Sequence, residues 1–355
     1  MASNLDRRMF VMGSAGLGMA VLAGGALAGC AGGTPGPDTA PETGTAPALE
    51  SEAAPESALS AEREDASNPN AAPVYFTADI SAAGLARAWE ALGVQPFGSV
   101  AVKLSTGEPG SNYLRPELVG DLVRTLNATI VECNTAYGGQ RGSVNQHLQV
   151  AADHGFTAIA DVDSMDADGY MSIPVDGGAH LSENLVGAHL SRYDWVVSLA
   201  HFKGHAMGGF GGAVKNCSIG IASSEGKLLI HSAGASTTSW GSPAQDDFLE
   251  SMAEAAKSVS DYLGGRMLYV NVMNRLSVDC DCDAHPAEPD MADIGILAST
   301  DPVALDRACV DLVYAAPDGA SLVRRMESRN GVHTLAHAEA LGLGSQTYRL
   351  VDLDV

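Results

Sequence analysis

The sequence contains few cysteines, and none of them have the spacing that an iron–sulfur cluster requires. Six cysteines occur among 355 residues, and no two of them form a CxxC motif. Cysteines at such short, regular spacings hold iron–sulfur clusters, so we expect no such cluster. Cys30 belongs to a processing motif described below. The five remaining cysteines are an odd number, which cannot pair completely within one chain.

Basic residues are also scarce. The chain has 20 lysines and arginines against 43 aspartates and glutamates, which gives a formal net charge of −23. Nucleic acids and anionic lipids attract proteins through lysine and arginine. The composition therefore argues against nucleic acid as a partner and offers no basic face to an anionic lipid surface.

A long apolar run is absent as well. The apolar segment 13–26 is rich in glycine and is shorter than the roughly 20 residues that a membrane helix needs. Arg7 and Arg8 precede this segment, and the sequence LAGC follows it and ends at Cys30. The first feature resembles a twin-arginine export signal and the second a bacterial lipobox. We therefore expect residues 1–30 to be a lipoprotein signal, with lipid on Cys30 anchoring an extracytoplasmic protein to the cell membrane.

Residues 31–72 have a different composition from the rest of the chain. They are rich in alanine, proline, glycine, serine, threonine and glutamate, and they show no apolar periodicity. Such a segment cannot bury enough surface to offset the entropy lost on ordering. We expect a disordered acidic linker here and a folded body at residues 73–355.

The folded body alternates apolar strand patterns with amphipathic helix patterns. We expect strands at residues 99–105, 128–132, 193–200, 266–271, 294–298 and 348–353, and helices at 81–92, 116–126, 144–154, 248–263 and 301–313. This alternation is typical of a mostly parallel sheet with helices on both faces. The sequence therefore predicts an α/β fold. Its length allows one large domain, although we expect two Rossmann-like lobes.

The densest group of chemically active side chains lies at residues 201–231. This segment contains three histidines and three lysines among many glycines, directly after the expected strand 193–200. Ligands of α/β folds bind beyond the carboxyl ends of strands, and glycine allows a ligand to approach the backbone closely. We interpret the segment as a ligand site. The alternative is a glycine-rich surface loop with solvated histidines.

A second group, with the sequence DCDCDAH, runs from Asp279 to His285. Two thiols and a histidine within a few residues could bind zinc or a softer metal. The C-x-C spacing is tighter than that of an ordinary zinc knuckle. Cys280 and Cys282 are therefore candidates for metal ligands, for a redox pair, or for part of a pocket wall.

Five motifs together resemble domain of unknown function family 362. They are LRPE at 114–117, CNTAYGGQR at 133–141, SLAHFKGHAMGGFGGAVKN at 198–216, DCDC at 279–282 and DIGILASTDPVALD at 293–306. Many members of that family carry a ferredoxin-like insert after the position of His231. Residues 232–247 of this chain are few and contain no cysteine. The electron-transfer role that the insert implies is therefore not expected here.

The spacing of His205, Lys215 and His231 is similar to that in nickel-pincer lactate racemases. In those enzymes the lysine holds a pincer cofactor covalently, the later histidine ligates nickel, and the earlier histidine acts as a base. The resemblance implies nickel or another divalent metal as the cofactor and a small acid as the substrate. Arg115, in an Arg-Pro pair, would correspond to the arginine that clamps the substrate carboxylate.

Several residues therefore become candidates. The catalytic candidates are His205 and Lys215, the cofactor-binding candidates are Arg115, Gly211, Gly212, Lys215 and Asn216, and the metal-ligand candidates are His231, Cys280 and Cys282. A lysine buried among apolar residues loses solvation, so its pKa falls and its amine becomes a nucleophile. The alternative is a lysine that binds a phosphate or carboxylate only as a point charge.

Three functions are compatible with these features. The first is an exported enzyme with a metal or organometallic cofactor that acts on a small carboxylic or hydroxy acid. The second is a non-catalytic metal-binding or redox lipoprotein whose redox partner the sequence does not identify. The third is a lipoprotein that binds a small acid as a solute. Twin-arginine export carries proteins already folded around their cofactors, which favours the first.

Overall fold

The structure is a computed structural model that describes Asn68 and residues 71–355. The predicted signal, Cys30 and almost all of the predicted linker lie outside the described residues. The first described strand, β1 (Ala72–Thr77), begins close to the expected start of the folded body. Within the described part of the chain, no helix has both the length and the apolar character needed to cross a membrane.

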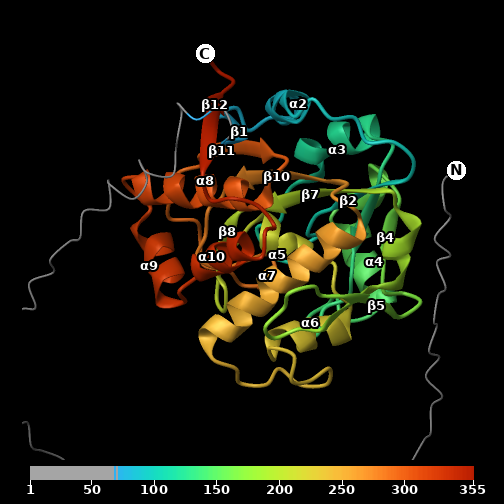
Figure 1. The fold of residues 1–355 in the computed structure, drawn as a ribbon. Helices are drawn as coiled ribbons and strands as arrows, with labels where there is room; N and C mark the ends of the chain where they lie inside the picture. The colour runs from blue at the N-terminus through green and yellow to red at the C-terminus, as the bar shows by residue number, and fades with distance from the viewer. Residues whose placement is uncertain (1–67, 69–70) are drawn as a thin grey trace, which may run out of the picture. The chain divides into compact units, whose positions relative to one another are not determined.

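An eight-stranded sheet forms the centre of the described body (Figure 1). The strand order is β12-β1-β11-β10-β7-β2-β3-β4. After β1, the bounds are Val100–Lys103 for β2, Thr129–Glu132 for β3, Val162–Ser164 for β4, Trp195–His201 for β7, Met267–Met273 for β10, Gly295–Ser299 for β11 and Tyr348–Asp352 for β12. Neighbouring strands are parallel except where β11 pairs antiparallel with β1 and β10. The predicted α/β fold with a mostly parallel sheet is confirmed.

Helices cover both faces of this sheet because alternate strand residues point to opposite sides. On one face, Val102 and Val270 pack in the same core as Leu85 of α2 (Ala82–Ala91), and α3 (Pro116–Thr125) and α4 (Val144–Asp153) contribute to that core. On the other face, Ala101 and Leu297 pack in the core formed with α7 (Gln245–Tyr262) and α8 (Pro302–Ala315).

Eight strands of the body join into one continuous sheet, which differs from the expected arrangement of two lobes. β7 pairs with β2 on one side, at Val102 and Val197, and with β10 on the other side, at Val270 and Leu199. β7 therefore joins the strands on its two sides into one sheet. Residues 71–355 also belong to one compact unit.

Segment 201–231, interpreted from the sequence as a ligand site, contains two short strands and two helices. These are β8 (Lys203–His205), β9 (Gly209–Gly211), α5 (Ala213–Cys217) and α6 (Ser224–His231). α6 begins where the side chain of Ser223 accepts the N–H of Gly226, at 3.1 Å, which satisfies one free amide of the first turn. The remaining elements are β5 (Tyr170–Pro174), β6 (Glu183–Gly187), α9 (Ala320–Ser328), α10 (His333–Ala340) and two short 3₁₀ turns.

Candidate functional site

A cavity of about 400 Å³ lies at the carboxyl ends of three parallel strands. Lys103 ends β2, Glu132 ends β3 and His201 ends β7, and all three residues line the cavity. This is the edge of a parallel sheet at which α/β proteins bind ligands. The volume is that of a small-molecule site.

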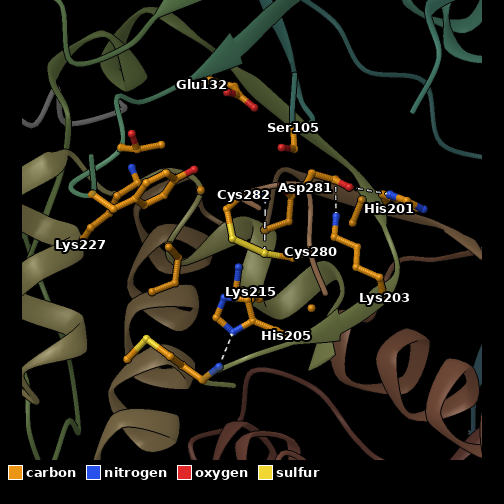
Figure 2. A pocket seen from close by; sticks show the side chains of 18 of the residues that line it. Ser105, Glu132, His201, Lys203, His205, Lys215, Lys227, Cys280, Asp281 and Cys282 are labelled. Atoms are coloured by element: carbon orange, nitrogen blue, oxygen red, sulfur yellow. Dashed lines mark hydrogen bonds and ion pairs between the residues drawn. A yellow bond between two sulfur atoms is a disulfide. The ribbon is translucent and has the colours of Figure 1, made fainter. Parts of the chain in front are cut away.

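Most of the predicted site residues meet in this cavity. Figure 2 shows Lys215, His205 and the sulfur atoms of Cys280 and Cys282 lying together in it. The predicted residues that line the cavity are His205, Gly211, Gly212, Lys215, Asn216, His231, Cys280 and Cys282. The glycine-rich turns therefore fold the segment back across the strand ends, which brings the two histidines and the lysine to one place.

Arg115 is not among the residues that line the cavity, so the structure does not support its predicted role as a carboxylate clamp. Pro116 fixes the first turn of α3, and the preceding residue is exposed, with its guanidinium 4.0 Å above the ring of Tyr113. Arg141 is the arginine that lines the cavity. Its side chain donates to Glu108 at 3.1 Å and to Glu132 at 3.2 Å.

The position of Lys215 is set by the helix that carries it. α5 begins after Gly212, and its first two amides, from Ala213 and Val214, donate to the carboxylate of Asp306 at 2.7 and 2.9 Å. A Cβ at Gly212 would lie 2.3 Å from Asp306 Oδ1. Only glycine allows the buried carboxylate to approach the start of the helix this closely. Lys215 then follows within the first turn, on the side that lines the cavity.

Lys215 has an unusual electrostatic environment. Burial within the protein, together with the charges of Lys203, Lys103 and Lys227, lowers the pKa of Lys215 to about 7. Its amine makes no hydrogen bond or ion pair with any described residue, although the side chain keeps some access to the cavity. A large fraction of this amine is therefore neutral and nucleophilic at physiological pH.

The other three lysines of the cavity are held by partners. Lys103 Nζ donates to the carbonyl of Leu104 at 2.8 Å and lies 3.9 Å from Glu132. Lys203 forms a buried ion pair with Asp281. Lys227 Nζ donates to the carbonyl of Ala222 at 2.5 Å. These partners satisfy the three ammonium groups and leave the Lys215 amine available to a ligand.

Hydrogen bonds place the ring proton on opposite nitrogens in His205 and His231. His231 Nδ1 lies 2.6 Å from the carbonyl of Lys227, which can only accept, so Nδ1 carries the proton and Nε2 has a free lone pair. His205 Nδ1 accepts the N–H of Gly208 at 2.8 Å, so the proton of the neutral ring is on Nε2.

Both histidine rings are neutral at pH 7. Burial lowers the pKa of His231 to about 4 and the pKa of His205 well below its ordinary value. The cavity therefore contains one imidazole nitrogen that can accept a proton or bind a metal, and one imidazole N–H that can donate.

Cys280 and Cys282 are joined by a disulfide. One ligand atom each from these cysteines and from His205 lie within 4.8 Å of one another, which is the geometry of a possible metal site. His231, the histidine proposed as a metal ligand from the sequence, is not part of this group. The cysteines are therefore close enough to bind one ion, but only as free thiolates.

Comparison with known proteins identifies the family of this chain. The model of the family described as domain of unknown function (DUF362) matches residues 100–311. The chain belongs to the DUF362 family. The prediction made from the five motifs is confirmed, and no curated protein matches the chain.

Two solved structures are similar to this DUF362 chain. One is the lactate racemase apoprotein from Thermoanaerobacterium thermosaccharolyticum, with 17% identity, a TM-score of 0.36, and coverage of 59% of this chain and 51% of that chain. The other is a protein from Thermotoga maritima, with 13% identity, a TM-score of 0.39, and coverage of 64% of this chain and 57% of that chain. The DUF362 chain thus spans little more than half the length of either protein.

Several charged residues of the cavity were not predicted from the sequence, and among them Glu132 has many contacts. Glu132 accepts hydrogen bonds from the amide of Thr106 at 2.7 Å and from Arg141, and it contacts His147. Burial alone would raise the pKa of Glu132, but the charges of Arg141 and Lys103 lower this pKa well below its ordinary value. The sequence contained a signal, because Lys103 and Glu132 each end an otherwise apolar strand.

Proposed function

We propose that this DUF362 protein is an enzyme that binds a small organic acid in the cavity and uses the amine of Lys215 as its covalent nucleophile. One observation carries the proposal. Lys215 combines a pKa of about 7 with the absence of any partner among the described residues, at the wall of a ligand-sized cavity. A lysine with a strongly lowered pKa in a cleft is a recognised mark of covalent catalysis.

The charges that line the cavity favour an anionic ligand. The basic residues at its wall are Lys103, Lys203, Lys215, Lys227 and Arg141, and the carboxylates are Glu132 and Asp281. The basic residues outnumber the carboxylates at this wall, in a chain with a net charge of −23. A positively lined, partly desolvated pocket attracts carboxylates.

The three site residues support formation of an imine with an oxo acid. The neutral Lys215 amine attacks the carbonyl carbon and forms a C–N bond, and the carbonyl oxygen leaves as water after taking two protons. His205 can donate a hydrogen bond from Nε2–H to that oxygen, and His231 can accept a proton of the attacking amine through Nε2 and pass it to the oxygen. Once the imine has formed, the same His231 nitrogen is available to remove a proton from the carbon next to it.

A metal-bearing organic cofactor attached to Lys215 also fits these residues. The free Nε2 of His231 is a suitable metal ligand, because the hydrogen bond from Nδ1–H to a backbone carbonyl is the usual support of such a ligand. When bound, that group would supply a hydride acceptor for a hydroxy acid. Lys215 would hold it, and the basic residues of the wall would orient the substrate carboxylate.

The test is reductive trapping with borohydride. Purified protein incubated at pH 7 with pyruvate and then reduced should gain one covalent adduct, located by peptide mass spectrometry at Lys215. K215R should gain none, whereas K257R, which changes a lysine outside the cavity, should be labelled like the wild type. Acetone has the carbonyl without the carboxylate and should label much more slowly.

Two results would separate the alternatives. Pyruvate that binds in calorimetry but never forms an adduct would refute covalent catalysis and favour a solute-binding protein. Protein purified from its native host with extra mass on Lys215 and stoichiometric nickel would identify the cofactor-bearing form.

We further propose that the enzyme is exported and anchored to the membrane. The paired arginines at positions 7 and 8 and the lipobox-like sequence that ends at Cys30 support this. A cofactor or a prefolded site would explain the use of a route that exports folded proteins.

A further inference from the structure

The disulfide of Cys280 and Cys282 lies against His205 at the wall of the cavity. His205 is at the end of β8, and both cysteines are in the loop that follows β10. Cys280 and His205 are buried and Cys282 is partly buried. One ligand atom from each residue lies within 4.8 Å of the other two, and no fourth histidine, cysteine, aspartate or glutamate of the described residues belongs to the group.

We propose that reduction of the Cys280–Cys282 disulfide creates a binding site for one soft divalent metal ion, held by both thiolates and by His205. This inference goes beyond the proposed function, because it needs neither the organic acid nor the amine of Lys215. It also replaces the metal ligand His231, suggested by the sequence, with His205.

The metal site forms in two steps, reduction of the disulfide and binding of the ion. A dithiol or phosphine reductant supplies two electrons, the S–S bond breaks, and the sulfurs take up two protons to become thiols. A divalent ion such as zinc then binds both sulfurs and displaces the two thiol protons to solvent. In the disulfide each sulfur is bonded to the other and is not a thiolate. The metal site therefore exists only in the reduced protein.

The positions of the three donors suit such an ion. Metal–sulfur bonds of about 2.3 Å and metal–nitrogen bonds of about 2.0 Å mean that two ligand atoms of one ion lie at most about 4.6 Å apart. The observed limit of 4.8 Å is close to this span, and the two sulfurs, which are now bonded to each other, must move apart on reduction. Two thiolates and an imidazole form a soft donor set, which favours zinc and similar ions over magnesium or calcium.

Nearby charges favour the thiolates over other ligands. Lys203 lines the same wall, and positive charge stabilises a thiolate. Asp281, between the two cysteines, is already occupied, because it forms an ion pair with Lys203 and contacts His201 at 2.9 Å. Three protein ligands beside an open cavity leave a fourth position for water or for the carboxylate of a ligand, as in catalytic zinc sites.

Binding of the metal must also change the hydrogen bonding of His205. Its Nδ1 now accepts the N–H of Gly208 at 2.8 Å. An ion on Nε2 would require the ring proton to move to Nδ1, and an ion on Nδ1 would replace the amide directly. In either case the Gly208 amide loses its acceptor. The NMR signal of that amide therefore reports metal binding independently of any colour change.

Cobalt(II) is the probe that tests this site. The full chain is reduced with a phosphine under anaerobic conditions, freed of reductant and titrated with Co²⁺. We expect one equivalent to bind with an intense thiolate-to-cobalt charge-transfer band. The same protein reoxidised with diamide should show no such band, and this comparison needs no mutation.

Variants identify the ligands. C280S and C282S should each abolish the band, and H205A should weaken cobalt binding by roughly 100-fold. H285A, which changes the exposed histidine of the same loop, is the matched control and should bind cobalt like the wild type. Circular dichroism establishes that each variant is folded, and the Gly208 amide signal should shift only in variants that bind.

The outcomes distinguish this proposal from the proposed function. K215R should lose the pyruvate adduct but keep the cobalt site. A reduced wild-type protein without the charge-transfer band would overturn the metal proposal and leave the role of Lys215 intact. It would also be overturned by a band that persists in the C280S/C282S double variant, or by loss of binding in H231A but not in H205A.

Discussion

The carboxylate of Asp306 caps the short helix that carries Lys215. It accepts the amides of Ala213 and Val214 and also a hydrogen bond from the side chain of Asn271 at 2.7 Å. Burial raises the pKa of Asp306 to about 6, although these hydrogen bonds act in the opposite direction. A buried carboxylate thus fixes the direction of the helix that carries Lys215.

Replacing Asp306 with alanine should therefore destabilise the protein and disorder the site. Loss of the cap leaves three buried donors without an acceptor, and we expect the free energy of unfolding to fall by about 2–4 kcal/mol. Chemical denaturation checks the stability. D121N changes an exposed aspartate and should alter stability by less than about 0.5 kcal/mol. If D306A remained as stable as the wild type, the capping role would be wrong.

Asp281 should matter more to stability at neutral pH than in acid. Burial alone would raise its pKa, but the charges of Lys203 and His201 lower the pKa of Asp281 well below the ordinary 3.8. The folded-state pKa of this acid is depressed. Its contribution is therefore complete above pH 3.8 and is lost as the pH falls toward the folded-state pKa.

D281N leaves Lys203 without its partner and should cost about 3 kcal/mol at pH 7. The difference in the free energy of unfolding between D281N and the wild type should become smaller below pH 3.8. Urea unfolding at a series of pH values measures this difference. A difference that stays constant across the series would contradict the lowered pKa of Asp281.

The reactivity of Lys215 should depend on pH in a way that an ordinary lysine does not. Because its pKa is about 7, acylation by a limiting amount of acetic anhydride should reach half of its maximal rate near pH 7. An ordinary lysine becomes reactive near pH 10.4. Peptide mass spectrometry after brief labelling gives the rate for each lysine separately. A Lys215 rate that continues to rise above pH 9 would exclude the lowered pKa.

The lowered pKa of Lys215 should also make the stability of the folded protein depend on pH. The folded protein binds fewer protons than the unfolded chain between pH 7 and 10.5, so its stability should rise with pH across that window. Replacing Lys215 with methionine removes the cost of the buried charge. We expect K215M to be more stable than the wild type below pH 7, by about 1–3 kcal/mol, and the gain to shrink as the pH rises. Thermal unfolding at pH 6 and pH 9 measures both values.

Cys30 should determine where the protein is found. Lipid on this cysteine is expected to attach the mature protein to the membrane, so C30A should move the protein from the membrane fraction to the soluble fraction or leave it unprocessed. Fractionation and N-terminal mass analysis decide the question. C133S, which changes a cysteine of the folded body, should fractionate like the wild type. An unchanged distribution of C30A would rule out lipid attachment at this residue.

Much of the fold was predictable because its helices have strong local signals. Pro116 and Pro302 each occupy a first turn, and Asp301 caps α8 by accepting the amides of Val303 and Ala304. α6 was not among the helices expected from the sequence. A Cβ at Gly226 would lie 2.0 Å from the carbonyl of Leu185. Tertiary packing, which sequence periodicity does not reveal, requires glycine there.

The site was predictable where its residues are close in sequence. His205, Lys215 and His231 of the glycine-rich segment line one cavity. The pairing of His205 with Cys280 depends on how β8 meets the loop after β10, and no local pattern records that contact. The position of Arg115 was misjudged for a related reason. An Arg-Pro pair fixes the start of a helix but not the direction of the side chain that precedes it.

The strands at the two ends of the folded body lie side by side. β1 pairs with β12 in parallel, with Val74 opposite Leu350, and on its other side it pairs with β11 (Figure 1). A ribosome makes β1 well before β11 and β12, so β1 has neither of these neighbours until residues 295–299 have been translated. A nascent chain that stops before β12 would expose an unpaired edge of β1. Pairing with residues 348–352 is therefore a checkpoint for the folding of β1.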